Sequence, residues 1–120
     1  MPVDSFLNNR NDNIIEVVIS KNNIPIRLTC KQWAHITENH DYMSGCADMV
    51  LETIAEPDFI VQGQRGELLA LKHYDKTVIT EKYAVAVYKE ITQEDGFVIT
   101  AFMTSEPGRI TRKGIISWQK

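Results

Sequence analysis

The apolar and polar positions divide the chain into a strand-rich start, a helical middle and a strand-rich second half. Apolar β-branched runs at 14–19 and 24–28 flank residues 21–23, where asparagine can adopt the left-handed conformation that a tight turn needs. This pattern predicts a β-hairpin. Pro25 has no N–H group to donate, so we expect the second strand to lie at a sheet edge. The preceding residues, 1–13, are rich in Asn and Asp and are predicted to form a mobile segment.

Apolar residues at helical spacing predict two short helices in the middle of the chain. Thr29 and Gln32 have the spacing at which a hydroxyl and an amide satisfy each other's free backbone N–H groups at a helix start, so a helix is expected over about 30–39. Further apolar residues recur at helical spacing between 49 and 54, and Pro57 ends this second helix.

After Pro57 the apolar period changes to two, which is typical of strands. Strands are expected at 59–61, 67–74, 82–91 and 97–104, and the tail is expected to dock as a last short strand. The sequence therefore predicts one α+β domain over 14–120. It consists of an N-terminal β-hairpin, two helices and a curled antiparallel sheet of about four strands.

The alternation also assigns residues to the two faces of the sheet, because successive side chains of a strand point in opposite directions. We assign two sets to the layer beneath the helices: Phe97, Ile99, Ala101 and Met103 on one strand, and Leu69, Leu71 and His73 on another. This leaves five polar residues for the open face: Lys72, Tyr74, Tyr88, Thr100 and Thr104. A cation, phenols and hydroxyls are suited to holding a phosphodiester, although the same residue types also serve solubility on sheet surfaces.

Composition and charge narrow the function classes. The chain has 120 residues, of which 43% are hydrophobic and 24% charged, as in an ordinary globular domain. It has no membrane-length apolar run and no secretion-signal pattern at its start, so we expect a cytoplasmic protein. The net charge of -3 argues against a large nucleic-acid footprint. Its densest basic cluster, Arg109, Arg112 and Lys113, can either grip phosphates or form a solvated turn.

The histidines are candidates for acid–base chemistry. His35 and His40 are five residues apart, which places them about 140° apart around a helix, so they do not form a same-face pair of metal ligands. Either could act alone as a general acid or base, or serve as a helix cap or surface residue. His73 alternates with Leu71 and is expected to be structural. We predict no metal and no cofactor.

Several short motifs together resemble the phage-type nucleases of the barnase, EndoU, colicin and RelE-like (BECR) superfamily. The similarity runs from about residue 28 to 118. Its motifs are Trp33-Ala34-His35-Ile36, Glu38-Asn39-His40, Glu56-Pro57-Asp58-Phe59-Ile60 and Gly96-Phe97-Val98-Ile99-Thr100-Ala101-Phe102.

The resemblance implies two helices on a four-stranded antiparallel sheet, and metal-independent cleavage of RNA by transfer to the adjacent 2′-hydroxyl. It also implies a toxin or a phage or mobile-element nuclease, with RNA and an inhibitor or antitoxin as partners. The expected catalytic residues are His35 or His40 as acid or base, Lys72 or Arg109 for the developing charge, and Tyr74 and Thr100 for the phosphate. The expected RNA-binding residues are Tyr88, Thr104, Arg109, Arg112 and Lys113. The acidic charge departs from many toxins of this superfamily, and a non-catalytic module that binds a protein or nucleotide on the same face is the alternative.

Overall fold

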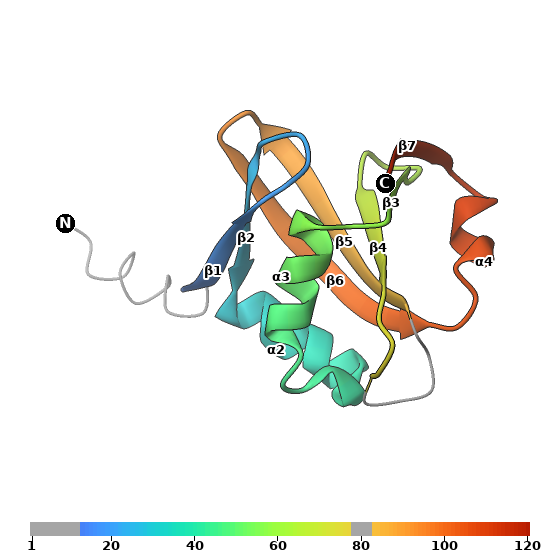
Figure 1. The fold of residues 1–120 in the computed structure, drawn as a ribbon. Coiled ribbons are helices and arrows are strands. Elements are labelled where there is room, and N and C mark those ends of the chain that lie inside the picture. The colour runs from blue at the N-terminus through green and yellow to red at the C-terminus, as the bar shows by residue number, and fades with distance from the viewer. Residues whose placement is uncertain (1–12, 78–82) are drawn as a thin grey trace.

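The computed structural model describes residues 13–77 and 83–120 of the chain. Its fold class is α+β, as predicted, with short helices packed on one large sheet (Figure 1). The predicted mobile segment lies outside the described residues except for Asn13. The elements follow one another as β1 (Ile14–Ile19), β2 (Pro25–Thr29), α2 (Cys30–Asn39), the 3-10 helix η2 (Asp41–Met43), α3 (Ala47–Ala55), β3 (Phe59–Gln62), β4 (Leu68–His73), β5 (Tyr83–Thr92), β6 (Asp95–Thr104), α4 (Gly108–Thr111) and β7 (Ile115–Gln119).

The sheet has seven strands in the order β1-β2-β6-β5-β4-β3-β7. The hairpin of β1 and β2 and the meander from β3 to β6 are antiparallel, which confirms both predictions. Two features were not predicted: β2 lies parallel to β6, and β7 pairs with β3 at the far edge. The sheet is therefore mixed, and it is wider than the predicted four strands because the hairpin and the tail both join it.

The prediction that Pro25 marks an edge strand is wrong. The edge is β1, and β2 lies between β1 and β6. Pro25 is tolerated because it is the first residue of β2. The strand β2 pairs with β6 further along, at Arg27 opposite Phe97, so this pairing does not need an N–H group at position 25. In the turn before β2, Asn23 has a φ of 66°, the left-handed conformation that the sequence predicted.

Helices α2 and α3 cover one face of the sheet and build the main core with it (Figure 1). Helix α2 begins after Thr29, whose hydroxyl accepts a hydrogen bond from the Gln32 N–H group at 3.1 Å, as the capping spacing predicted. Ile36 of α2 and Ile54 of α3 are fully buried. Small residues of three neighbouring strands lie in the same core and let the helices approach the sheet closely: Ala70, Ala86 and Ala101.

The predicted assignment of faces is wrong in part, because the central strands are apolar on both sides. On β4 it is Ala70 that packs beneath the helices, whereas Leu71 is buried in a second cluster. On β6 the register shifts, because Val87 pairs with Thr100 whereas the next residue, Tyr88, pairs with Val98. Ile99 is therefore an extra residue, a β-bulge, and the alternation of faces reverses there.

This bulge turns Val98, as well as Ala101 and Met103, toward the main core, while Ile99 packs against the second cluster. Ala101 and Met103 are therefore on the predicted side, and Ile99 is not. The bulge has no signature that alternation alone could reveal.

We call the face that points away from α2 and α3 the distal face. Its buried residues are Val61, Leu71, Val85 and Val87. Ile110 of α4 packs against them, so the segment from β6 to β7 passes over this face. Among the described residues, no helix is long and apolar enough to cross a bilayer.

Candidate functional site

Lys72 and Tyr74 pack against helix α3, not on an open face as the sequence predicted. Lys72 Nζ donates a hydrogen bond to the carbonyl oxygen of Glu56 at 2.9 Å, at the C-terminal end of α3. The Tyr74 hydroxyl donates to a carboxylate oxygen of Glu52 at 2.5 Å. Burial and then this bond to Glu52 raise the pKa of Tyr74. Both side chains therefore connect β4 to α3.

Tyr88 is the clearest departure from the predicted open face. It pairs with Leu68 across β4 and β5 and is 0% exposed in the main core. Its hydroxyl has no hydrogen-bond partner within the part of the chain that the structure describes. Burial, and to a smaller extent the negative charge of Glu90, raise the pKa of this phenol. Tyr88 is therefore a core residue and cannot contact RNA.

Thr100 and Thr104 do lie on the distal face, on either side of Phe102 along β6. Phe102 packs against the distal cluster, and alternation places the two threonines on its side of the strand. Thr104 is opposite Tyr83, and Tyr83 is in turn opposite His73, with 5.1 Å between the centroids of these two rings. The ends of three strands thus carry a polar row across the distal face.

His40 reaches the same face from the C-cap of helix α2. Beyond the end of β2, α2 and η2 cover the outer edge of β6, where the Gln32 side chain donates to the carbonyl oxygen of Ile99. The Tyr42 hydroxyl accepts a hydrogen bond from the Met103 N–H group at 3.2 Å. These side chains replace a neighbouring strand, so the end of α2 is held at the rim of the sheet.

The His40 ring lies 6.0 Å from the Phe102 ring and 5.8 Å from the Tyr42 ring, centroid to centroid. His35 has a different environment: it is exposed, and one ring nitrogen lies 3.4 Å from the side-chain nitrogen of Asn39. The two histidines therefore do not form one site. Only His40 meets the strand that carries Thr100 and Thr104.

The predicted basic cluster is partly helical, which the sequence did not indicate. Arg109 lies in α4, and its Nε pairs with a carboxylate oxygen of Glu106 at 2.6 Å. The Glu106 N–H group donates to the Thr104 hydroxyl at 3.0 Å, so Arg109 is linked through Glu106 to the end of β6. Arg112 and Lys113 follow α4 and are exposed. Glu106 was missed from the sequence because a single carboxylate in a turn carries no distinguishing pattern.

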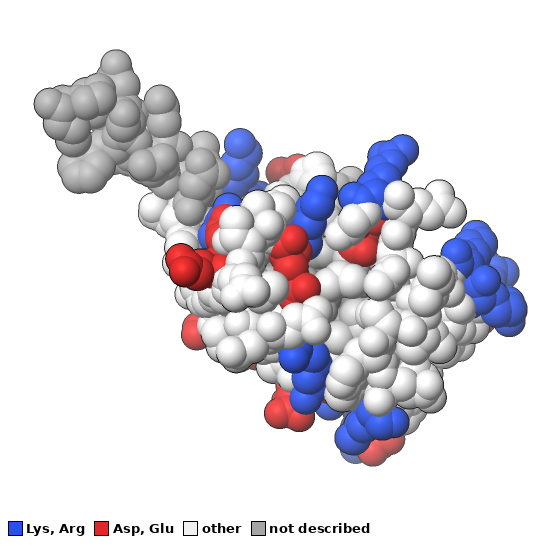
Figure 2. Space-filling model, turned by 90° about the horizontal axis from the view of Figure 1, so that it is seen from above, with Lys and Arg blue, Asp and Glu red and all other residues white. Residues whose placement is uncertain are grey.

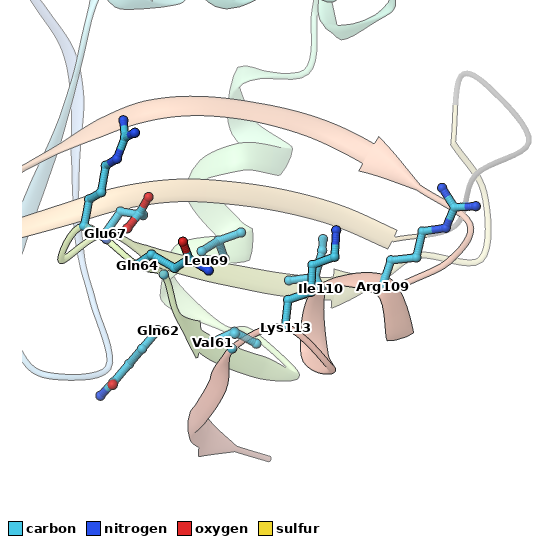
Figure 3. A pocket seen from close by; sticks show the side chains of 11 residues that line it. Val61, Gln62, Gln64, Glu67, Leu69, Arg109, Ile110 and Lys113 are labelled. Carbon is cyan, nitrogen blue, oxygen red and sulfur yellow. Dashed lines mark hydrogen bonds between the residues drawn. The ribbon is translucent and has the colours of Figure 1, made fainter.

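The distal face also contains a pocket of about 450 Å³. It lies between the turn that joins β3 to β4 and the segment from α4 to β7 (Figure 3). Its lining combines apolar residues of the sheet and α4 with cations, among them Arg65 and Lys113. This pocket was not predicted, because the turn around Arg65 carries no recognisable binding motif in the sequence.

The described residues contain no group of three or more His, Cys, Asp or Glu side chains placed to hold a metal ion. A scan against protein-family models and searches of curated proteins and of solved structures each found no match for the chain. The geometry of the distal face therefore has to carry the functional argument alone.

Proposed function

We propose that this chain is a metal-independent endoribonuclease whose site lies on the distal face, where His40 meets β6. The arrangement around Phe102 carries the proposal, because an imidazole meets a row of hydroxyls there: the His40 ring is 6.0 Å from Phe102, and Thr100 and Thr104 flank Phe102 on the same face. Arg109 adds a cation at the end of β6 through its link to Glu106. RNA as the partner and the cytoplasm as the location belong to the same proposal.

The chemistry requires few protein groups. The neutral His40 imidazole accepts the proton of the 2′-hydroxyl as the 2′-oxygen bonds to phosphorus, and the 5′-oxygen leaves with a proton from solvent. The Thr104 hydroxyl donates a hydrogen bond to a non-bridging oxygen of the scissile phosphate, and the Thr100 hydroxyl, four residues or about 13 Å away along β6, donates to another phosphate of the RNA. Arg109 stabilises the additional negative charge of the transition state. The products are a 2′,3′-cyclic phosphate and a free 5′-hydroxyl.

Lys72, Tyr74 and Tyr88 have no place in this proposal. The first two bond to α3, and the third is buried. His35 provides a matched control, since it lies in the helix that His40 caps and is exposed.

The test is cleavage of a single-stranded RNA in the presence of EDTA, with the ends of the products identified. We expect cyclic phosphate ends, a loss of about a hundredfold or more in rate for His40→Gln, and a rate close to that of the wild type for His35→Gln. Circular dichroism confirms that each variant is folded. If the folded wild-type protein leaves RNA intact, or if His40→Gln cleaves as fast as the wild type, the proposal is wrong.

One observation favours a non-catalytic binding module as the second candidate. Arg109, the cation of the proposed site, is already paired with Glu106, which reduces the charge that it can offer to a transition state. A binding module predicts that His40→Gln changes the affinity for a ligand while no turnover exists to be lost. The same cleavage assay separates the two candidates.

A further inference from the structure

The pocket of the distal face has the composition of a site for an organic anion. Its floor is apolar and is formed by Val61 of β3, Leu69 of β4 and Ile110 of α4. Its walls are polar and come from the β3–β4 turn and from the residues after α4 (Figure 3). The volume of about 450 Å³ lies within the usual range of small-molecule sites, roughly 300–1,000 Å³.

Two cations stand on opposite walls of this pocket. Within the described residues, the side-chain nitrogens of Arg65 and Lys113 make no hydrogen bond and no ion pair. Lys113 is next to Ile110 in the pocket, whereas Arg109 points away from both (Figure 3). The guanidinium of Arg109 is paired with Glu106. Two positive charges therefore face the pocket, while the third, that of Arg109, points away from it.

The one carboxylate of the lining is committed to the turn. Glu67 accepts a hydrogen bond from the backbone N–H group of Arg65 at 2.7 Å. Backbone hydrogen bonds from Arg65 and from Glu67 itself lower the pKa of this carboxyl, and the charge of Arg65 adds to the effect. Glu67 thus fixes the shape of the turn.

Gln64 supplies a group that can both donate and accept hydrogen bonds. Its amide lies beside Leu69 in the pocket, whereas the Gln62 side chain points away (Figure 3). An amide of this kind suits the edge of a nucleobase, and an apolar surface suits the flat face of the base. A sugar phosphate alone would leave the floor formed by Val61, Leu69 and Ile110 unused.

We propose that this pocket binds a nucleotide, with the base over the apolar floor, its edge at Gln64 and its phosphate between Arg65 and Lys113. The role of the pocket as a subsite for RNA rests on the proposed function, whereas its binding of a nucleotide does not. Leu69 is four residues from His73 along β4, or about 13 Å. The pocket is therefore separate from the His40 end of the face and would hold a nucleotide beyond the one that is cut.

The experiment titrates the isotopically labelled full chain with 5′-AMP, and separately with adenosine and with inorganic phosphate, and follows backbone amide signals. We expect 5′-AMP to shift the signals of residues 63–67 and 109–114, and to bind at least about tenfold more tightly than adenosine or phosphate. Lys113→Gln and Arg65→Gln should each weaken 5′-AMP binding by roughly tenfold. Lys31→Gln, an exposed cation on α2, is the matched control and should bind as the wild type does.

Several outcomes would overturn the proposal. They are shifts confined to other residues, unchanged affinity in the folded Arg65→Gln and Lys113→Gln variants, and phosphate or adenosine binding as tightly as 5′-AMP. Equal binding of a pentaglutamate peptide would identify an acidic protein as the ligand instead. Binding of 5′-AMP by a protein that does not cleave RNA would contradict only the ribonuclease proposal. Cleavage without 5′-AMP binding would contradict only this one.

Discussion

Replacing Tyr88 by Phe should stabilise the protein. The Tyr88 ring is 0% exposed, and its hydroxyl finds no hydrogen-bond partner among the described residues. Burying a hydroxyl without a partner costs about 1–3 kcal/mol, because its hydrogen bonds to water are lost and not replaced. Phe keeps the ring and its packing and removes only the oxygen. We therefore expect the free energy of unfolding to rise by about 1 kcal/mol.

The assay is urea unfolding followed by circular dichroism, together with thermal melting. For a domain of this size, a gain of about 1 kcal/mol raises the Tm by roughly 3–6 °C. RNA cleavage should be unchanged by Tyr88→Phe, since the residue lies in the core and not on the distal face. A lower Tm, or a large loss of cleavage, would show that the hydroxyl has a partner or a role in the site.

Tyr42→Phe is the matched control for this substitution. The Tyr42 hydroxyl accepts a hydrogen bond from the Met103 N–H group at 3.2 Å, at a stretch of the β6 edge that no strand of the described residues covers. Removing it leaves that buried N–H group without its partner and should cost about 1–2 kcal/mol. The same chemical change is thus expected to have opposite signs at the two tyrosines, which a general effect of losing a hydroxyl cannot produce.

Three further predictions concern stability. Because the pKa of Tyr88 is raised, the folded state keeps a proton that the unfolded chain loses near pH 10, so the contribution of Tyr88 to stability should be constant below that pH and fall above it. Urea unfolding at pH 9.5 and at pH 11 should show this decline in the wild type and a smaller decline in Tyr88→Phe. Gly114→Ala should lower the free energy of unfolding by about 1–3 kcal/mol, because the new Cβ would lie 2.5 Å from the Gln62 carbonyl oxygen. In the control Gly108→Ala the new Cβ meets only the flexible end of a side chain, so urea unfolding should show little change in stability. Lys72→Met should cost about 1 kcal/mol through its lost hydrogen bond to α3 and leave RNA cleavage within a few-fold of the wild type; a hundredfold loss would restore Lys72 as a catalytic residue.

Most of the elements were predictable because they have local causes, whereas the short helices η2 and α4 were not predicted. The Thr29 cap sets the start of α2, Pro57 follows α3, and the left-handed Asn23 forms the hairpin turn. The strand order was predictable only where consecutive strands pair. The parallel contact of β2 with β6 and the return of β7 to β3 depend on how the helices and α4 pass over the sheet, which no local pattern encodes.

The composition of the candidate site was only partly predictable, because alternation identifies two faces without indicating which one the helices cover. Ala70 and Leu71 are both buried, one on each face. The more apolar residue was assigned to the helices, but close packing of a helix on a sheet favours the smaller one. That one reversal on β4 moved Lys72 and Tyr74 to the wrong side, while Thr100 and Thr104 were placed on the open face as observed.

The net charge of -3 hides a marked separation of charge along the chain, and this separation bears on both proposals. Residues 30–56, which include the helices α2 and α3, contain one lysine against five acidic residues. Residues 105–120, which pass over the distal face, contain four basic residues against one acidic. Figure 2 shows basic side chains at the edge of the molecule where α4 lies.

Charges are screened beyond about 8–10 Å at physiological salt. An anionic ligand on the distal face is therefore attracted by the basic segment and repelled only weakly by the acidic helices. The basic segment is small, however, and Glu106 already neutralises part of it. A nucleic acid held by so few charges gains little sequence-independent affinity. The affinity then has to come from a fitted contact such as a base on the apolar floor of the pocket, so an acidic protein of this kind would be selective for short single-stranded segments.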